Sequence, residues 1–171
     1  MTTGHDDTGP FSDRTTRVER ISDRELRVTR VFDAPARIVF AAWTTPALFM
    51  RWWAPKSVGA RIVGCDMDVR TGGGYRLEFA MDGMDNMEFF GRYLEVIPDA
   101  KLVWTNEEGA EGAVTTVTFE EKEGRTHLTY LDLYPSKEAL DEATDGMGAA
   151  MPEQFDQLDT LLAAGDGPAG L

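Results

Sequence analysis

The chain is poor in residues that bind metals or form disulfides. Its 171 residues include one cysteine, Cys65, and two histidines, His5 and His127. A single cysteine cannot form an internal disulfide, so we expect a reducing, cytoplasmic location. None of these three residues lies at a usual metal-ligand spacing from another. We therefore expect no metal site, and we expect no other cofactor.

Basic residues and long apolar runs are also scarce. Lysine and arginine number 17 against 30 acidic residues, which gives a formal net charge of −13. Nucleic acids and anionic membranes need a basic surface, so both are excluded as partners. No run approaches the length of a membrane-spanning helix, and we expect no membrane insertion. The many carboxylates after Ser136 indicate a solvated helix face, with a docking surface for a basic partner as the alternative.

Recognisable catalytic motifs are missing as well. The glycines at positions 72–74 lack a following Lys-Ser/Thr and predict a hairpin turn, not a phosphate-binding loop. Cys65 precedes Asp66 in a predicted strand, where burial and a carboxylate would raise the thiol pKa. His127 lies in another predicted strand and is more typical of a structural histidine than of a general base. No serine has the flanking glycines of a nucleophile elbow.

The most informative segment is an amphipathic pattern near the C-terminus. Met147, Met151, Phe155, Leu158 and Leu162 recur at helical spacing, which predicts a long helix over Met147–Ala163. The residues between them are polar and acidic, which indicates a solvated opposite face. Pro152 should lie in the first turn, because inside a helix it breaks the hydrogen-bond ladder.

Period-two patterns upstream predict strands. The first is Glu25–Phe32, with a short partner before it, and two short helices follow, beginning near Pro35 and Pro46. Six antiparallel strands then occupy residues 60–134, separated by glycine-rich turns. The pattern predicts an α+β fold in which a curved antiparallel sheet wraps around the last helix. We expect one domain over residues 16–164, with a disordered tail at 1–15 and a flexible tail at 165–171.

Five motifs follow one another along the chain: Arg-Val-Phe-Asp-Ala-Pro at 30–35, Ala-Trp-Thr at 42–44, Trp-Trp-Ala-Pro at 52–55, Met-Asp-Val-Arg-Thr-Gly-Gly at 67–73 and Gly-Arg-Tyr-Leu-Glu-Val-Ile-Pro at 91–98. In this order they resemble the activator of Hsp90 ATPase homologue 1-like (AHSA1-like) family of the START-like, or SRPBCC (Bet v 1-like), superfamily. The similarity runs from about Leu26 to Leu162. Two positions depart from the family pattern: Ala54 replaces a frequent glycine, and Gly148-Ala149 replaces a frequent Gly-Trp.

The resemblance implies a helix-grip fold with a hydrophobic cavity between the sheet and the C-terminal helix. Aromatic and methionine side chains would line it, and simple core packing is the alternative for each. The expected ligand-binding residues are Trp52, Trp53, Tyr75, Phe79, Phe90, Trp104, Met147, Met151 and Phe155.

A second group of candidates is charged: Asp68, Arg70, Arg76, Arg92 and Glu95. An arginine pointing into the cavity could hold a ligand carboxylate. Cross-strand ion pairs on the solvent face are the favoured interpretation.

Three functions remain open. The first is binding of a small hydrophobic or amphipathic ligand, without catalysis. The second is a cyclase, dehydratase or hydrolase that uses the same cavity, with Arg76, Glu78 or Asp132 as polar candidates. The third, which rests on the family resemblance alone, is regulation of an Hsp90-type chaperone. A homodimer formed through an exposed sheet edge is compatible with the pattern.

Overall fold

The computed structural model describes residues 16–54, 56–107, 113–144 and 147–163. Eight strands form one antiparallel sheet in the order β1-β2-β8-β7-β6-β5-β4-β3. They are β1 (Arg17–Arg20), β2 (Glu25–Phe32), β3 (Arg61–Met67), β4 (Gly74–Ala80), β5 (Met87–Ile97), β6 (Lys101–Thr105), β7 (Val114–Lys122) and β8 (Arg125–Leu133). The predicted α+β, helix-grip architecture is confirmed.

Two short helices follow β2, as predicted. They are α1 (Ala36–Thr44) and α2 (Pro46–Phe49), and a 3-10 turn, η2 (Lys56–Val58), comes after them. Pro35 precedes α1 and Pro46 begins α2, positions where a missing N–H costs little. The Glu121 carboxylate accepts a hydrogen bond of 3.0 Å from the Ala36 amide. This bond fixes the start of α1 against β7.

The sequence pattern missed one helix, α3 (Lys137–Thr144). The Ser136 hydroxyl accepts a 3.1 Å hydrogen bond from the Ala139 amide, as an N-terminal cap does. Leu140 is fully buried in a small apolar cluster, hereafter the α3 cluster, whose members are Leu26, Ala113, Tyr134, Ala139 and Leu140. With eight mostly polar residues, α3 is too short for its period to stand out.

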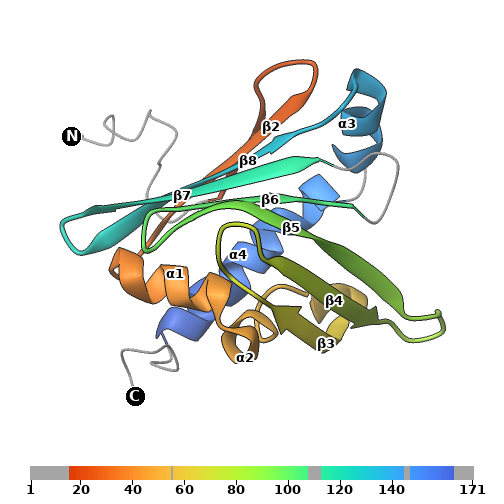
Figure 1. The fold of residues 1–171 in the computed structure, drawn as a ribbon, viewed down its shortest axis with the longest axis horizontal. Helices are drawn as coiled ribbons and strands as arrows, with labels where there is room; N and C mark the ends of the chain where they lie inside the picture. Colours follow the sequence, from red (N-terminus) through yellow and green to blue (C-terminus); the bar gives the residue numbers. More distant parts are fainter. Residues whose placement is uncertain (1–15, 55, 108–112, 145–146, 164–171) are drawn as a thin grey trace.

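The last helix, α4 (Met147–Ala163), lies across one face of the sheet (Figure 1). Its predicted bounds are confirmed, but the expectation that Pro152 lies in the first turn is wrong. Pro152 is the sixth residue of the helix. The hydrogen bond that its ring removes is the one to the carbonyl at position 148, so the loss falls near the helix start and the helix continues. No helix of the described residues is long and apolar enough to cross a membrane.

Most of the core lies between this helix and the face of the sheet that it covers, hereafter the concave face. Trp43, Trp52, Phe32 and Phe155 are its largest fully buried side chains. Phe32 from β2 and Phe155 from α4 meet edge to face, with ring centroids 5.6 Å apart. The helix and the sheet therefore share one apolar core.

Candidate functional site

Strand register brings inward-facing side chains into rows across the concave face. One row contains Asp132, Thr115, Trp104 and Tyr93, which are paired in sequence from β8 to β5. All four are buried. Because side chains alternate along a strand, this row places two aromatic rings beside a carboxyl and a hydroxyl.

Aromatic rings form a continuous wall on this face. Trp104 is 6.4 Å from Tyr93, 6.4 Å from Tyr75 and 6.3 Å from Tyr130, measured between ring centroids. Trp43 from α1 joins this wall to the helices, since its ring lies 6.0 Å from Trp104 and 6.1 Å from Phe155. Its central position depends on contacts between distant segments.

Seven of the nine predicted ligand-binding residues come together at the concave face or the core beside it. They are Trp52, Trp53, Tyr75, Phe79, Trp104, Met151 and Phe155, of which Tyr75 is half-buried and the others are buried. Phe90 lies apart, 39% exposed on the outer face of β5. It pairs with outward-facing Arg76 and has the opposite parity to Tyr93. The side chain of Met147 lies outside the described residues.

Tyr75 owes its position to a glycine on the next strand. A Cβ atom on Gly91 would lie 1.9 Å from the Thr105 carbonyl oxygen and 2.9 Å from the Tyr75 ring. Without that atom, the Tyr75 ring packs over β5, and its hydroxyl donates a 2.8 Å hydrogen bond to the Thr105 carbonyl. Position 91 therefore requires glycine, because the β6 backbone and the Tyr75 ring approach it too closely for a side chain.

A buried polar network adjoins the aromatic wall. The Thr115 hydroxyl donates to the Asp132 carboxyl at 2.5 Å and accepts from the Asn106 amide at 3.1 Å. The Tyr134 hydroxyl donates to the other Asp132 oxygen at 3.3 Å. The Asn106 carbonyl oxygen lies 3.2 Å from the Tyr75 hydroxyl. These contacts link both sides of the concave face through polar groups.

Burial raises the pKa of Asp132 to about 6, although hydrogen bonds from Thr115, Tyr134 and Tyr130 act in the opposite direction. Burial also raises the pKa values of Tyr130 and Tyr134, and the Asp132 charge adds to both shifts. The carboxyl therefore titrates near neutrality while its tyrosine neighbours keep their protons. Of the three polar candidates for catalysis, Asp132 alone lies on the concave face, because Arg76 and Glu78 have outward parity on β4.

The sequence pattern suggested that the polar face of α4 is solvated. The structure shows that part of this face bonds to the segment around the paired tryptophans. The Gln157 amide nitrogen donates to the Trp52 and Ala54 carbonyls, each at 2.8 Å, and the Lys56 amide donates to its oxygen at 2.9 Å. Glu153 accepts from the Ser57 amide at 2.8 Å. These bonds hold the backbone of Trp52, Ala54, Lys56 and Ser57 against α4.

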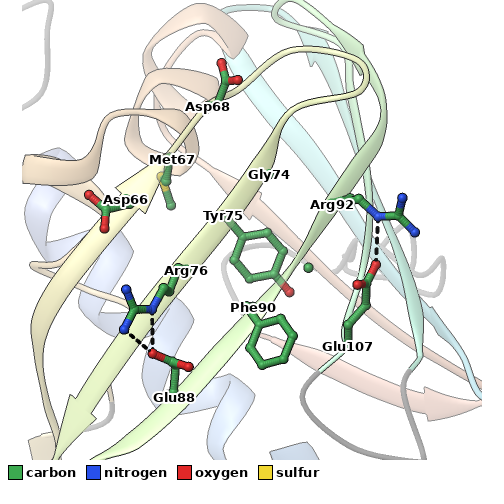
Figure 2. A pocket seen from close by; sticks show the side chains of 11 residues that line it. Asp66, Met67, Asp68, Gly74, Tyr75, Arg76, Glu88, Phe90, Arg92 and Glu107 are labelled. Atoms are coloured by element: carbon green, nitrogen blue, oxygen red, sulfur yellow. Dashed lines mark hydrogen bonds and ion pairs between the residues drawn. The ribbon is translucent and has the colours of Figure 1, made fainter.

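A groove of about 700 Å³ lies on the outer face of β3, β4 and β5 (Figure 2). Figure 2 shows Phe90 between two ion pairs, Arg76–Glu88 and Arg92–Glu107. The second pair has an N–O distance of 3.1 Å, and both arginines are more than 60% exposed. Asp68 likewise pairs with Arg70, and Glu95 with Lys101. Arg76–Glu88 and Lys101–Glu95 are cross-strand ion pairs on the solvent face, as predicted, whereas Asp68–Arg70 joins residues two apart in one segment.

Neither the cysteine nor a metal cluster adds to the site. Burial raises the pKa of the Cys65 thiol to about 11, and the Asp66 charge adds to the shift, as the sequence predicted. Within residues 16–54, 56–107, 113–144 and 147–163, no three histidine, cysteine or carboxylate residues converge as metal ligands.

The family model described as "Activator of Hsp90 ATPase homolog 1-like protein" matches residues 33–163. This match includes both short helices, all strands from β3 to β8 and the whole of α4. No curated protein sequence matches the chain at a significant level.

Solved structures share the fold over most of their length. A crystal structure of a protein from Rhodobacter sphaeroides has 25% identity and a TM-score of 0.80, and the match covers 87% of this chain and 98% of that one. A protein from Mycobacterium smegmatis has 25% identity and a TM-score of 0.75, with coverage of 88% and 98%. An AHSA1-like protein from Aeromonas hydrophila has 19% identity and a TM-score of 0.64, with coverage of 81% and 94%, which supports the fold alone.

Proposed function

The chain belongs to the activator of Hsp90 ATPase homologue 1-like family, and we propose that it binds a small hydrophobic or amphipathic molecule between the concave face and α4. Ligand sites in proteins combine mostly apolar walls with a few polar groups that fix orientation. The concave face has this combination. The observation that carries the proposal is the row of buried side chains across the concave face, in which Asp132, Thr115, Trp104 and Tyr93 follow one another from β8 to β5.

The proposed ligand contacts are the seven predicted residues that come together, with the Asp132 network at the polar end. Met151 and Phe155 supply the helix side, and Trp104 and Tyr75 supply the sheet side. Met151 is the most adaptable of these, because its unbranched side chain can repack around ligands of different shape.

Native mass spectrometry of the purified protein tests the proposal. We expect a bound small molecule, which denaturation releases for identification. Met151→Trp, which enlarges a side chain packed between helix and sheet, should reduce the bound fraction. Phe90→Trp, which introduces the same residue on the outer face, should leave it unchanged. An empty protein whose melting temperature no lipophile raises would contradict the proposal.

The family description supports a second candidate, regulation of an Hsp90-type chaperone. A regulator would change the ATPase rate of purified Hsp90 when added in stoichiometric amounts. An unchanged Hsp90 ATPase rate, with ligand binding intact, would exclude chaperone regulation and leave ligand binding as the supported function.

Catalysis in the same site is a third candidate, and the observation that favours it is the pKa of Asp132 near 6. An enzyme would lose turnover of a bound ligand on Asp132→Asn while keeping its fold. Binding without turnover would exclude this candidate for that ligand.

A further inference from the structure

We propose that the ligand carries a protonated amine, for which Asp132 is the counter-ion, with an apolar body lying along Trp104 and Tyr93. This inference rests on the proposed function and specifies the chemical class of the ligand. Three features of the concave face support it: the lack of a basic partner for a buried carboxyl, the kind of rings beside it, and one weak contact that a ligand can replace.

Asp132 is 4% exposed and has hydroxyl partners in place of a cation. In the part of the chain that the structure describes, no lysine, arginine or histidine is bonded to it, and the groups that act on its pKa are Thr115, Tyr134 and Tyr130. Buried carboxylates are normally paired or metal-bound, because removing a charge from water is costly. A cationic ligand would supply the missing partner.

The other buried charge on this face is already paired. The Arg30 guanidinium contacts Asp156 at 2.5 Å and Asp159 at 3.5 Å, both from α4. Arg30 pairs with Leu128, four residues from Asp132 along β8, or about 13 Å at the usual strand rise. On this face of the sheet, the buried Arg30 is therefore paired with carboxylates. Asp132, well separated from it, has no basic partner among the described residues.

The rings around Asp132 suit an ammonium group attached to an apolar body. Tyr130 and Tyr134 both interact with Asp132, and both keep their protons at neutral pH. Asp132 is therefore the only one of the three that carries a negative charge for the ammonium group to pair with. Electron-rich tyrosine and tryptophan faces attract cations. Trp104, which lies two strands from Asp132 in the same row, is about 10 Å away at the usual strand spacing. That span matches a small amphipathic amine.

The Tyr134 hydroxyl marks the position where the amine would bind. Its bond to Asp132 is 3.3 Å, against 2.5 Å for Thr115. Tyr134 belongs to the α3 cluster, so an amine that displaces this hydroxyl would approach from the α3 side. Thr115 would keep the carboxyl in place, since Asn106 holds its hydroxyl from behind.

Matched ligand pairs test this inference by isothermal titration calorimetry at pH 7.5. Benzyl, naphthylmethyl and octyl amines are each compared with the alcohol of the same carbon skeleton. We expect the best amine to bind about 10- to 100-fold more tightly than its alcohol, the range for hydrogen bonds to a charged group. Asp132→Asn should abolish this preference, so that each amine and its alcohol bind the variant with similar affinity.

Asp66→Asn is the matched control, because it removes the same charge from the outer side of β3. This variant should keep the preference for amines. If amines and alcohols bind wild-type protein equally, the amine inference is wrong while the proposed apolar site stands. If neither class binds, both proposals are wrong.

Proton release provides a readout that does not depend on a variant. A bound cation favours the ionised form of Asp132, so amine binding near pH 6 should release protons to the buffer. The measured binding enthalpy should then vary with the ionisation enthalpy of the buffer for amines and not for alcohols. Equal buffer dependence for both would overturn the inference.

Discussion

Arg30 of β2 and Asp156 of α4 form an ion pair with an N–O distance of 2.5 Å, although the two residues are 126 positions apart. The arginine side chain is 5% exposed and the aspartate side chain 70% exposed. The pair joins the sheet to the helix that covers it, and Asp159 contacts the same guanidinium. It therefore helps to set the distance between the two walls of the proposed site.

Asp156→Asn should lower the free energy of unfolding by about 1–3 kcal/mol, because the nearly buried Arg30 guanidinium loses the closer of its two carboxylate partners. Urea denaturation measures the loss. Adding Arg30→Met should recover part of it, because the buried guanidinium, left with its longer contact to Asp159, is then gone. Glu120→Gln, which breaks an exposed pair with Lys122, should change stability by less than about 0.5 kcal/mol. Equal effects of the two single variants would contradict this account.

Gln157→Ala should loosen the segment after the paired tryptophans. Its side chain makes three hydrogen bonds to residues 52–56, and their loss should cost about 1–3 kcal/mol. Hydrogen exchange at the Lys56 amide should accelerate. Thr160→Ala, which removes a hydroxyl bonded within the helix, should leave that exchange rate unchanged.

Gly91→Ala should disrupt the junction of β5 and β6. The new methyl group would overlap the Thr105 carbonyl and the Tyr75 ring, so we expect a large drop in melting temperature or failure to fold. Gly64→Ala is the control, since its methyl group would meet Glu78 at 3.4 Å, an ordinary contact. Similar melting temperatures for the two variants would show that Tyr75 is not held in the way described.

The titration of Asp132 should appear in the stability of the protein. Its pKa in the folded state is about 6, above the usual 3.8, so the folded state binds the proton more tightly. The contribution of this group to stability is therefore greatest below pH 3.8 and is lost as the pH rises towards 6. Between pH 5 and pH 7, Asp132→Asn should gain roughly 1 kcal/mol relative to wild type. A constant difference across this range would contradict the pKa.

Long amphipathic patterns explain how much of the fold the sequence could predict. The apolar spacing from Met147 to Leu162 gave the bounds of α4, and strict alternation gave the strands. The short helix α3 was missed because eight residues give too few turns to show a period. Pro152 was placed in the first turn because proline disfavours a helix interior. In the structure the apolar pattern around Pro152 determines where the helix begins, and the helix includes the proline as its sixth residue.

The site was predicted in part for the same reason. Aromatic residues could be assigned to a face from their parity, and Phe90 is the one whose parity was overlooked. Asp132 shares its parity with Leu128 and Tyr130, a signal that it points inward. Its partner Thr115, and the Asn106 amide that donates to Thr115, could not be identified from the sequence. They come from β7 and from the segment after β6, and the sequence does not specify the register between these and β8.

The methyl resonance of Met151 in a ¹H–¹³C spectrum of the methionines tests the central claim most directly. Met151 is 2% exposed between α4 and the sheet, whereas Met84 is 57% exposed in the segment between β4 and β5. When a lipophilic amine is added, we predict that the Met151 signal shifts in a saturable manner while that of Met84 stays in place. A shift confined to Met84, or no shift at a concentration where calorimetry detects binding, would show that the ligand site is not on the concave face.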